Sequence, residues 1–343
     1  MAKLIFTADD YGIVEAIDNG VCEAISEGWI NSVEVFPNDP NKVQRSVQKL
    51  GQLDLGKFAQ AQGIQESDAV INVGAHLTIT SGYPLTKSRF FRQQKGSYSG
   101  AFRKWVEFER PKLKDRVQEI LDLEIELRRQ IETLKAEADK YPTLSFNHLT
   151  CHHNSLYYFE DYTATFYKIA KEYDMAVRTP IGRPKIKDNL FYLQLNIRLA
   201  DDLDDGDLDH MWDFHKNMDE FLARQKTLPK MTAFHNNVHY GPPPFINLDA
   251  RGMVRKARSK FKKMNKWLKK HEQDESVEFV FHLIEWDPGR LEEFEAQASF
   301  SQSRYPGINP GYFDGRMAEY YSLLNLMKND PSIATQFVNW SNL

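Results

Sequence analysis

The chain opens with a mostly apolar run that ends in two carboxylates. Residues 3–8 read Lys-Leu-Ile-Phe-Thr-Ala and are followed by Asp9, Asp10 and, two positions later, Gly12. This pattern is typical of a buried parallel strand, which carries polar side chains to the edge of a core where parallel-sheet proteins place their chemistry. Two neighbouring acids at a strand end point in different directions, so one can bind a metal while the other acts as a general base. The same residues also fit an ordinary turn.

Helical and extended patterns then alternate along the chain. Residues 15–28 carry apolar positions at helical spacing, and residues 30–37 alternate as a strand that stops at a proline. A helix over 43–53 and a strand over 69–77 continue the series. Because strand-helix-strand units connect parallel strands, the pattern predicts a parallel sheet.

The clearest helical pattern spans residues 112–141. Its apolar residues recur at helical spacing among many charged ones, over too few heptads for a coiled coil, so we expect a long helix packed against the sheet. The preceding stretch, 81–111, is rich in Gly, Ser, aromatic and basic residues and is predicted to be a long loop. Long loops near strand ends tend to shape functional sites.

Strand and helix patterns return in the second half of the chain. The expected elements are strands over 145–151, 176–178 and 277–281 and helices over 159–173 and 316–327. Between them, about residues 185–275 include a long stretch without clear periodicity. With 343 residues, the chain is long enough for one large α/β domain or for two of ordinary size, and its composition does not choose between them.

Histidines lie at the ends of two further predicted strands. His76 lies near the end of one strand, and His152 and His153 follow another. Since parallel strands bring their carboxyl ends to the same edge, these imidazoles are expected near Asp9 and Asp10. One or two carboxylates with two imidazoles form a ligand set for a divalent ion that leaves positions open for water and substrate. A single histidine after a strand is more often structural, and the spacing specifies no metal.

Composition and charge narrow the classes of function. The 343 residues are 41% hydrophobic and 27% charged, which is normal for a globular protein with a sizeable core. The net charge of -4 gives no overall attraction to nucleic acid or an anionic membrane, and no uncharged apolar run reaches the roughly 18 residues of a membrane span. The start lacks the pattern of a signal peptide. Because only Cys22 and Cys151 occur, no disulfide framework is expected, which favours a cytoplasmic protein.

Three further motifs give weaker evidence of a functional site. The acidic run over 201–207 has the glycine of an EF-hand, but a leucine and a tryptophan occupy two of the ligand positions. His235 and His239 are spaced as a helical metal pair, yet the Glu of His-Glu-x-x-His is missing and prolines follow, which favours a loop. The basic helix expected over 254–270 is better explained as a solvated face than as a nucleic-acid site.

Four blocks of sequence, in order over about the first 180 residues, carry a family resemblance. They are Thr7-Ala8-Asp9-Asp10-Tyr11-Gly12 with Asn31-Ser32-Val33; Gly74-Ala75-His76-Leu77-Thr78-Ile79-Thr80; residues 126–132 with His148-Leu149-Thr150-Cys151-His152; and Val177-Arg178-Thr179-Pro180. Together they resemble the YdjC-like (ChbG-type) carbohydrate deacetylases. Four blocks in the same order are much more specific than any one of them.

The resemblance implies a single α/β domain over residues 1–343, a deformed (β/α) TIM-like barrel with a parallel sheet that is elaborated by a long insertion at about residues 185–275. It also implies that a divalent metal, Mg²⁺ or Zn²⁺, assists hydrolysis of an N-acetyl group from an amino sugar or short N-acetylated oligosaccharide. By position, Asp10, His76 and His152 would bind the metal, while Asp9 would act as general base and Arg178 would orient it. The implied partner is an acetylated amino sugar, and the family suggests, without fixing, a homodimer.

Two departures from the family pattern leave alternatives open. Where the family usually has His-x-His, this chain has His152-His153-Asn154, and a shift of one residue would make His153 the ligand. For the family's His-Pro-Gly block, whose histidine protonates the leaving amine, aligning on the strand gives His282 and aligning on Pro-Gly gives Asp287. His282 is favoured because imidazole titrates near neutral pH. These departures also allow a catalytically weakened protein that binds metal or sugar.

Overall fold

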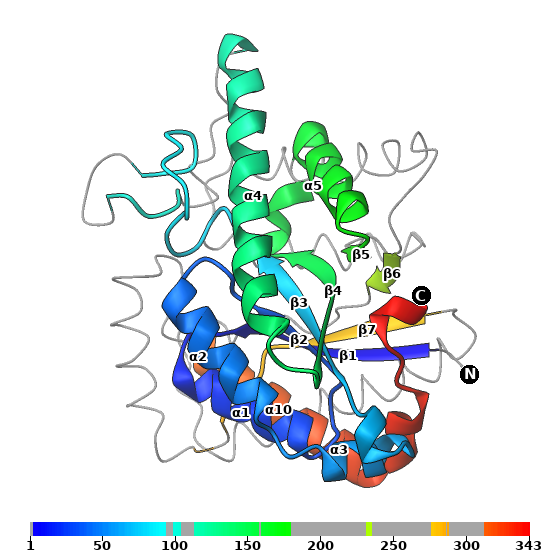
Figure 1. The fold of residues 1–343 in the computed structure, drawn as a ribbon. Helices are drawn as coiled ribbons and strands as arrows, with labels where there is room; N and C mark the ends of the chain where they lie inside the picture. Colours follow the sequence, from blue (N-terminus) through cyan, green and yellow to red (C-terminus); the bar gives the residue numbers. More distant parts are fainter. Residues whose placement is uncertain are drawn as a thin grey trace, which may run out of the picture.

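Seven parallel strands in the described part of the chain form a closed barrel. The structure is a computed structural model, and it describes residues 3–93, 99–103, 113–157, 159–179, 231–234, 276–285, 287 and 312–343. The strands are β1 (Lys3–Tyr11), β2 (Ser32–Val35), β3 (Ile71–Leu77), β4 (Leu144–Cys151), β5 (Ala176–Thr179), β6 (Met231–Phe234) and β7 (Ser276–Phe281). Each strand pairs with the next, and β7 pairs with β1. The expected parallel barrel is confirmed (Figure 1).

Helices cover the outside of the barrel. They are α1 (Glu15–Ser26), α2 (Pro40–Gly51), α3 (Gly56–Gln62), α4 (Arg116–Ala138), α5 (Glu160–Glu172) and α10 (Tyr312–Asn329). In Figure 1, α1, α2, α3 and α10 gather on one side, and α4 and α5 lie together on another. Helices cover the outer face of the strands, and side chains fill the inside of the barrel. Strands such as β1 are therefore buried along nearly their whole length.

The long helix α4 packs against the barrel as expected. Its buried residues Leu127, Ile131 and Leu134 recur at helical spacing, and the helix contacts α2, α5 and β3. Near its start, Val117 and Leu121 are exposed, where the helix projects past the barrel (Figure 1). The apolar residues of the helical pattern are therefore buried only in the part of α4 that lies against other elements.

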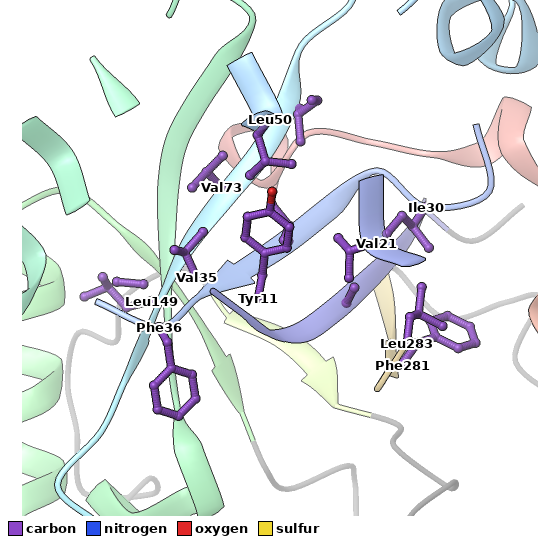
Figure 2. Packing of buried hydrophobic residues seen from close by; sticks show 14 of the residues in the cluster. Tyr11, Val21, Ile30, Val35, Phe36, Leu50, Val73, Leu149, Phe281 and Leu283 are labelled. Carbon is purple, nitrogen blue, oxygen red and sulfur yellow. The ribbon is translucent and has the colours of Figure 1, made fainter. Parts of the chain in front are cut away.

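One buried apolar cluster joins the strands to the first helices. Figure 2 shows Val35, Val73 and Leu149 from three adjacent strands in the same cluster as Val21 of α1 and Leu50 of α2. All five side chains have no exposed surface. Truncating a buried leucine such as Leu50 or Leu149 to Ala removes about 2–5 kcal/mol of stability, so this cluster contributes strongly to the stability of the barrel.

The end of the chain runs beneath the barrel, at the amino-terminal ends of the strands. Backbone N–H of Val338 donates to Leu4 O at 3.1 Å, and Asn31 Nδ2 donates to Val338 O at 2.9 Å. Trp340 is fully buried, and its indole N–H donates to Ser32 Oγ at 3.0 Å. No periodicity predicts this segment, whose two short 3-10 helices, Pro331–Gln336 and Trp340–Asn342, depend on contacts with the barrel.

Some predictions were incomplete, and others fall outside the described residues. The short elements α3 and β6 were not predicted, and β6 lies within the segment assigned to the insertion. The acidic run, the His235 and His239 pair and the basic segment 254–270 lie outside the described residues. The single-domain organisation stays a prediction. Among the described residues, no helix is long and apolar enough to span a bilayer.

Candidate metal and catalytic site

The carboxyl-terminal ends of the strands bring the predicted polar residues together. Asp9 and Asp10 lie at the end of β1, His76 is the second-to-last residue of β3, and His152 directly follows β4. Arg178 lies in β5 at the same end of the barrel. All are buried or nearly so, although they are polar. Buried polar groups must be paired with one another or with a ligand, which makes this end of the barrel the candidate site.

A bulge at the end of β1 separates the two carboxylates. The register of β1 against β2 shifts within residues 8–11, and Asp10 has a φ of 67°, in the left-handed region that few residues other than glycine adopt. Below this turn, Asp18 accepts the backbone N–H of Gly12 at 2.7 Å and the hydroxyl of Ser46 at 2.9 Å. Side chains from α1 and α2 thus hold a backbone conformation that would otherwise be unfavourable.

Asp10, His76 and His152 form a triangle of ligand atoms. Asp10 Oδ1 lies 3.4 Å from His76 Nε2 and 3.2 Å from His152 Nδ1, and the two nitrogens are 3.2 Å apart. Donor atoms bonded to one ion at about 2.1 Å lie about 3.0 Å apart at octahedral angles and about 3.4 Å apart at tetrahedral angles. The triangle therefore fits one divalent ion, with further coordination positions open.

His153 takes a different position from His152. Its Nδ1 lies 3.1 Å from Thr80 Oγ1, and its ring lies against that of His152 with a centroid separation of 3.8 Å. The backbone of His153 and of Asn154 is left-handed, with φ values of 56° and 52°. Of the two adjacent histidines, His152 is the one that lies with Asp10 and His76 in the structure.

Asp9 is held by a two-point contact with Arg178. Arg178 Nη1 and Nη2 each donate to one oxygen of Asp9 at 2.8 Å, and the same guanidinium donates to Glu278 at 2.9 and 2.7 Å. Burial opposes ionisation of Asp9, but Arg178 and His76 outweigh it, so the pKa of Asp9 lies below its usual value. Asp9 is therefore an ionised carboxylate, 3.9 Å from His76 Nε2.

Arg316 of α10 contacts the other oxygen of Asp10. Its Nη2 donates to Asp10 Oδ2, which leaves Oδ1 to face the histidines. Burial opposes ionisation of Asp10, but Arg316 and His152 hold its pKa well below the usual range. Burial likewise disfavours protonation of His76, yet Asp9 and Asp10 raise its pKa. The charge of each group depends on the others, as expected for a compact buried site.

Both candidates for the leaving-group acid lie in described residues after β7. The backbone N–H of His282 donates to Glu319 Oε2 at 2.6 Å, and its ring Nδ1 lies 3.7 Å from the same oxygen. His282 is close enough to Asp9 to help lower the pKa of that carboxyl. Asp287 is half-buried, and its backbone N–H donates to Glu285 O at 3.1 Å.

Sequence reasoning missed three charged residues of this end of the barrel. Glu34 and Glu278 each stand inside a short apolar strand, and a charged residue in a fully buried strand is a signal that could have revealed them. Arg316 carries no such signal, because charged residues are ordinary in an amphipathic helix.

Comparisons with known proteins agree with this architecture. The family model described as YdjC-like protein matches residues 3–305. The chain is 27% identical to a carbohydrate deacetylase of Oceanobacillus iheyensis over 51% of this chain and 64% of that protein, and 26% identical to carbohydrate deacetylase 1 of Listeria innocua over 55% and 69%. The matched region thus spans about two thirds of the length of these relatives.

A solved structure from Enterococcus faecalis V583 shows the same fold. That protein, provisionally described as a cellobiose-phosphate cleavage protein, aligns with a TM-score of 0.56 at 14% identity, covering 99% of this chain and 98% of that one. At this level of sequence identity, the similarity shows a shared fold and nothing about function. The match of the family model over most of the sequence is decisive, and the chain belongs to the YdjC-like protein family.

Proposed function

We propose that this protein is a metal-dependent carbohydrate deacetylase that hydrolyses the N-acetyl group of an amino sugar or short N-acetylated oligosaccharide. The observation that carries the proposal is the triangle of Asp10, His76 and His152 beside an ionised Asp9 that Arg178 holds. The substrate class is supported by relatives that are named carbohydrate deacetylases.

Asp10, His76 and His152 would hold the metal in this proposal. Two imidazoles and one carboxylate suit Zn²⁺ and similar ions better than Mg²⁺, which prefers a shell of oxygen ligands. When bound, such an ion makes a water molecule more acidic and polarises the amide carbonyl. Arg316 donates a hydrogen bond to Asp10 Oδ2, so Oδ1 is the oxygen of Asp10 that would bind the metal.

Asp9 would act as the general base. Its lowered pKa keeps it ionised at neutral pH, and Arg178 fixes both oxygens so that the carboxylate cannot rotate. Asp9 takes a proton from the water that attacks the amide carbon. His282 would then donate a proton to the amide nitrogen as the C–N bond breaks, giving acetate and the free amino sugar.

Acetate release from N-acetylglucosamine and its short oligomers, measured with a series of divalent ions, tests the proposal. Purified wild-type protein is expected to release acetate only when a suitable ion is present, and Asp9→Asn is expected to abolish release. Asp68→Asn is the matched control, because this exposed carboxylate precedes β3 at the other end of the strand. Sugar binding without acetate release under any ion would contradict hydrolysis and support a binding protein instead.

A further inference from the structure

A charged network fills the barrel interior directly below the metal triangle. Glu34 of β2 and His148 and Thr150 of β4 are fully or almost fully buried. Glu34 Oε1 lies 2.5 Å from His148 Nε2, and Glu34 Oε2 accepts the hydroxyl of Thr150 at 2.6 Å. Barrels of this kind usually fill this space with branched apolar side chains. Charged groups in such a place are costly unless each is paired.

Thr150 connects Glu34 to His76. Burial opposes ionisation of Glu34, but the adjacent His148 outweighs it and the pKa of Glu34 lies below its usual value, so its carboxylate only accepts hydrogen bonds. The single hydroxyl hydrogen of Thr150 therefore points to Glu34. Thr150 Oγ1 can then only accept from His76 Nδ1, which lies 2.8 Å away. This leaves the lone pair of His76 on Nε2, the nitrogen that faces Asp10 and His152.

The position of Glu34 is maintained from below. His148 Nδ1 lies 2.7 Å from Asn147 Oδ1, and the amide group of Asn147 is oriented by its donation to Asn72 Oδ1 at 2.8 Å. Both ring nitrogens of His148 thus face acceptors. The ring stacks on Trp340 at a centroid distance of 4.1 Å and an interplanar angle of 4°. The stacking adds a contact across the face of the ring to the two contacts at its nitrogens.

The backbone leaves room for this network at one glycine. A Cβ added to Gly74 of β3 would clash with both His148 Nε2 and Glu34 Oε2. Glu34 also has Arg178 within reach, since Glu34 Oε1 lies 3.7 Å from Arg178 Nη2. The same carboxylate therefore adjoins the residue that holds Asp9 and, through Thr150, a histidine of the triangle.

We propose, resting on the function proposed above, that Glu34 is a positioning residue of the metal site, which acts through Thr150 to make His76 a ligand by Nε2. A histidine ligand needs its other ring nitrogen to donate to a fixed acceptor, which sets both the tautomer and the ring orientation. Glu34 and Thr150 supply that acceptor. Loss of such a partner typically weakens metal binding about 10–100-fold.

The first test measures the tautomer of His76 in metal-free wild-type protein. Long-range ¹H–¹⁵N NMR of protein labelled at histidine distinguishes the two neutral tautomers, and a His76→Gln variant identifies the signals. At a pH where the ring is neutral, the hydrogen is expected on Nδ1. A hydrogen on Nε2 would overturn the proposal, and this outcome does not depend on the folding of any other variant.

The second test compares Thr150→Val with Thr163→Val. Both changes remove a buried hydroxyl, but Thr163 lies in α5 and donates to the backbone oxygens of Leu156 and Phe159 at 3.1 and 3.2 Å rather than to a residue of the triangle. Titration with Co²⁺ or Zn²⁺ is expected to show about 10–100-fold weaker binding for Thr150→Val and wild-type binding for Thr163→Val and Thr150→Ser. Equal affinities for the two valine variants would contradict the proposal.

Neither measurement uses a sugar, so the outcome is separate from that of the deacetylation assay. A protein that binds metal as expected but releases no acetate would contradict the proposed reaction and leave the role of Glu34 supported. A wild-type protein that binds no divalent ion would contradict the metal site, and the His76 tautomer would still decide whether Glu34 and Thr150 orient that ring.

Discussion

Polar groups at the mouth of the barrel, where the carboxyl-terminal ends of the strands meet, are paired differently from the polar groups in the interior beneath it. At the mouth, Asp10 Oδ1 and His76 Nε2 face each other at 3.4 Å, and two acceptors at that separation need a cation or a proton between them. Beneath, Glu34 meets donors from His148 and Thr150. The polar atoms at the mouth therefore leave a place for a cation. Those of the interior are paired with one another, and they fix the orientation of the side chains at the mouth.

The largest effect is expected at the mouth, from removal of the proposed acid. His282→Ala should lower kcat for deacetylation about 10²–10⁴-fold, because general acid catalysis of amine departure is lost. Metal affinity should stay at the wild-type value, since His282 is outside the triangle. Asp287→Asn, measured alongside, should keep near wild-type kcat. The reverse result, with Asp287 essential and His282 dispensable, would transfer the acid role to Asp287.

The next effect is expected at the base of the interior. Trp340→Ala should lower the free energy of unfolding by about 3–5 kcal/mol, because it removes a fully buried indole and the ring that stacks on His148. Trp340→Phe keeps an aromatic face and should lose less. Urea unfolding gives these values, and metal titration of the same samples should show weaker binding in the Ala variant. An Ala variant as stable as wild type would show that the chain end does not support the interior.

A pH effect is expected from Asp18, which supports the turn at the mouth. Burial raises the pKa of Asp18 from 3.8 to about 6. Between these values the folded protein holds a proton that the unfolded chain has lost, so this group lowers stability as pH rises through that window, by up to about 3 kcal/mol. Asp18→Asn should therefore gain stability relative to wild type from pH 4 to pH 7 in urea unfolding. Parallel curves for the two proteins would contradict this assignment.

The smallest effect is expected from crowding the interior. Gly74→Ala should destabilise the protein by about 1–3 kcal/mol and weaken metal binding, because the new methyl group displaces Glu34 and His148. Gly63→Ala is the control, since a Cβ there meets nothing within 4 Å and introduces only left-handed backbone strain at a φ of 70°. If metal binding is unchanged in both variants, the interior residues do not position the metal ligands at the mouth.

Local periodicity predicted most of the framework. Strands with strong apolar patterns, such as β1 and β3, and long amphipathic helices such as α4 and α10, were found close to their expected positions. The four-residue strand β6 was missed because it follows a long stretch without clear periodicity, and the seven-residue helix α3 was missed because it has too few positions for a pattern to emerge. The buried tail around Trp340 was missed because its 3-10 helices are short and show no periodicity.

Position along the chain also indicated which residues gather at the mouth. Asp9, Asp10, His76 and His152 end strands or directly follow them, and parallel strands bring those ends together whatever the details of packing. Their proposed roles stay predictions. The choice between adjacent histidines could not be made from spacing, since it depends on the turn after β4, where His153 has a left-handed backbone.

Partners far apart in sequence were decided by the tertiary structure alone. Asp10 and Arg316 are separated by 306 positions, and Glu34 and His148 by 114. The sequence by itself determined the parallel framework, the polar residues at its strand ends and the family blocks, because these follow from local pattern. Which oxygen of Asp10 faces the histidines, and which nitrogen of His76 faces Asp10, depends on side chains that only barrel closure and the packing of α10 bring within hydrogen-bonding distance.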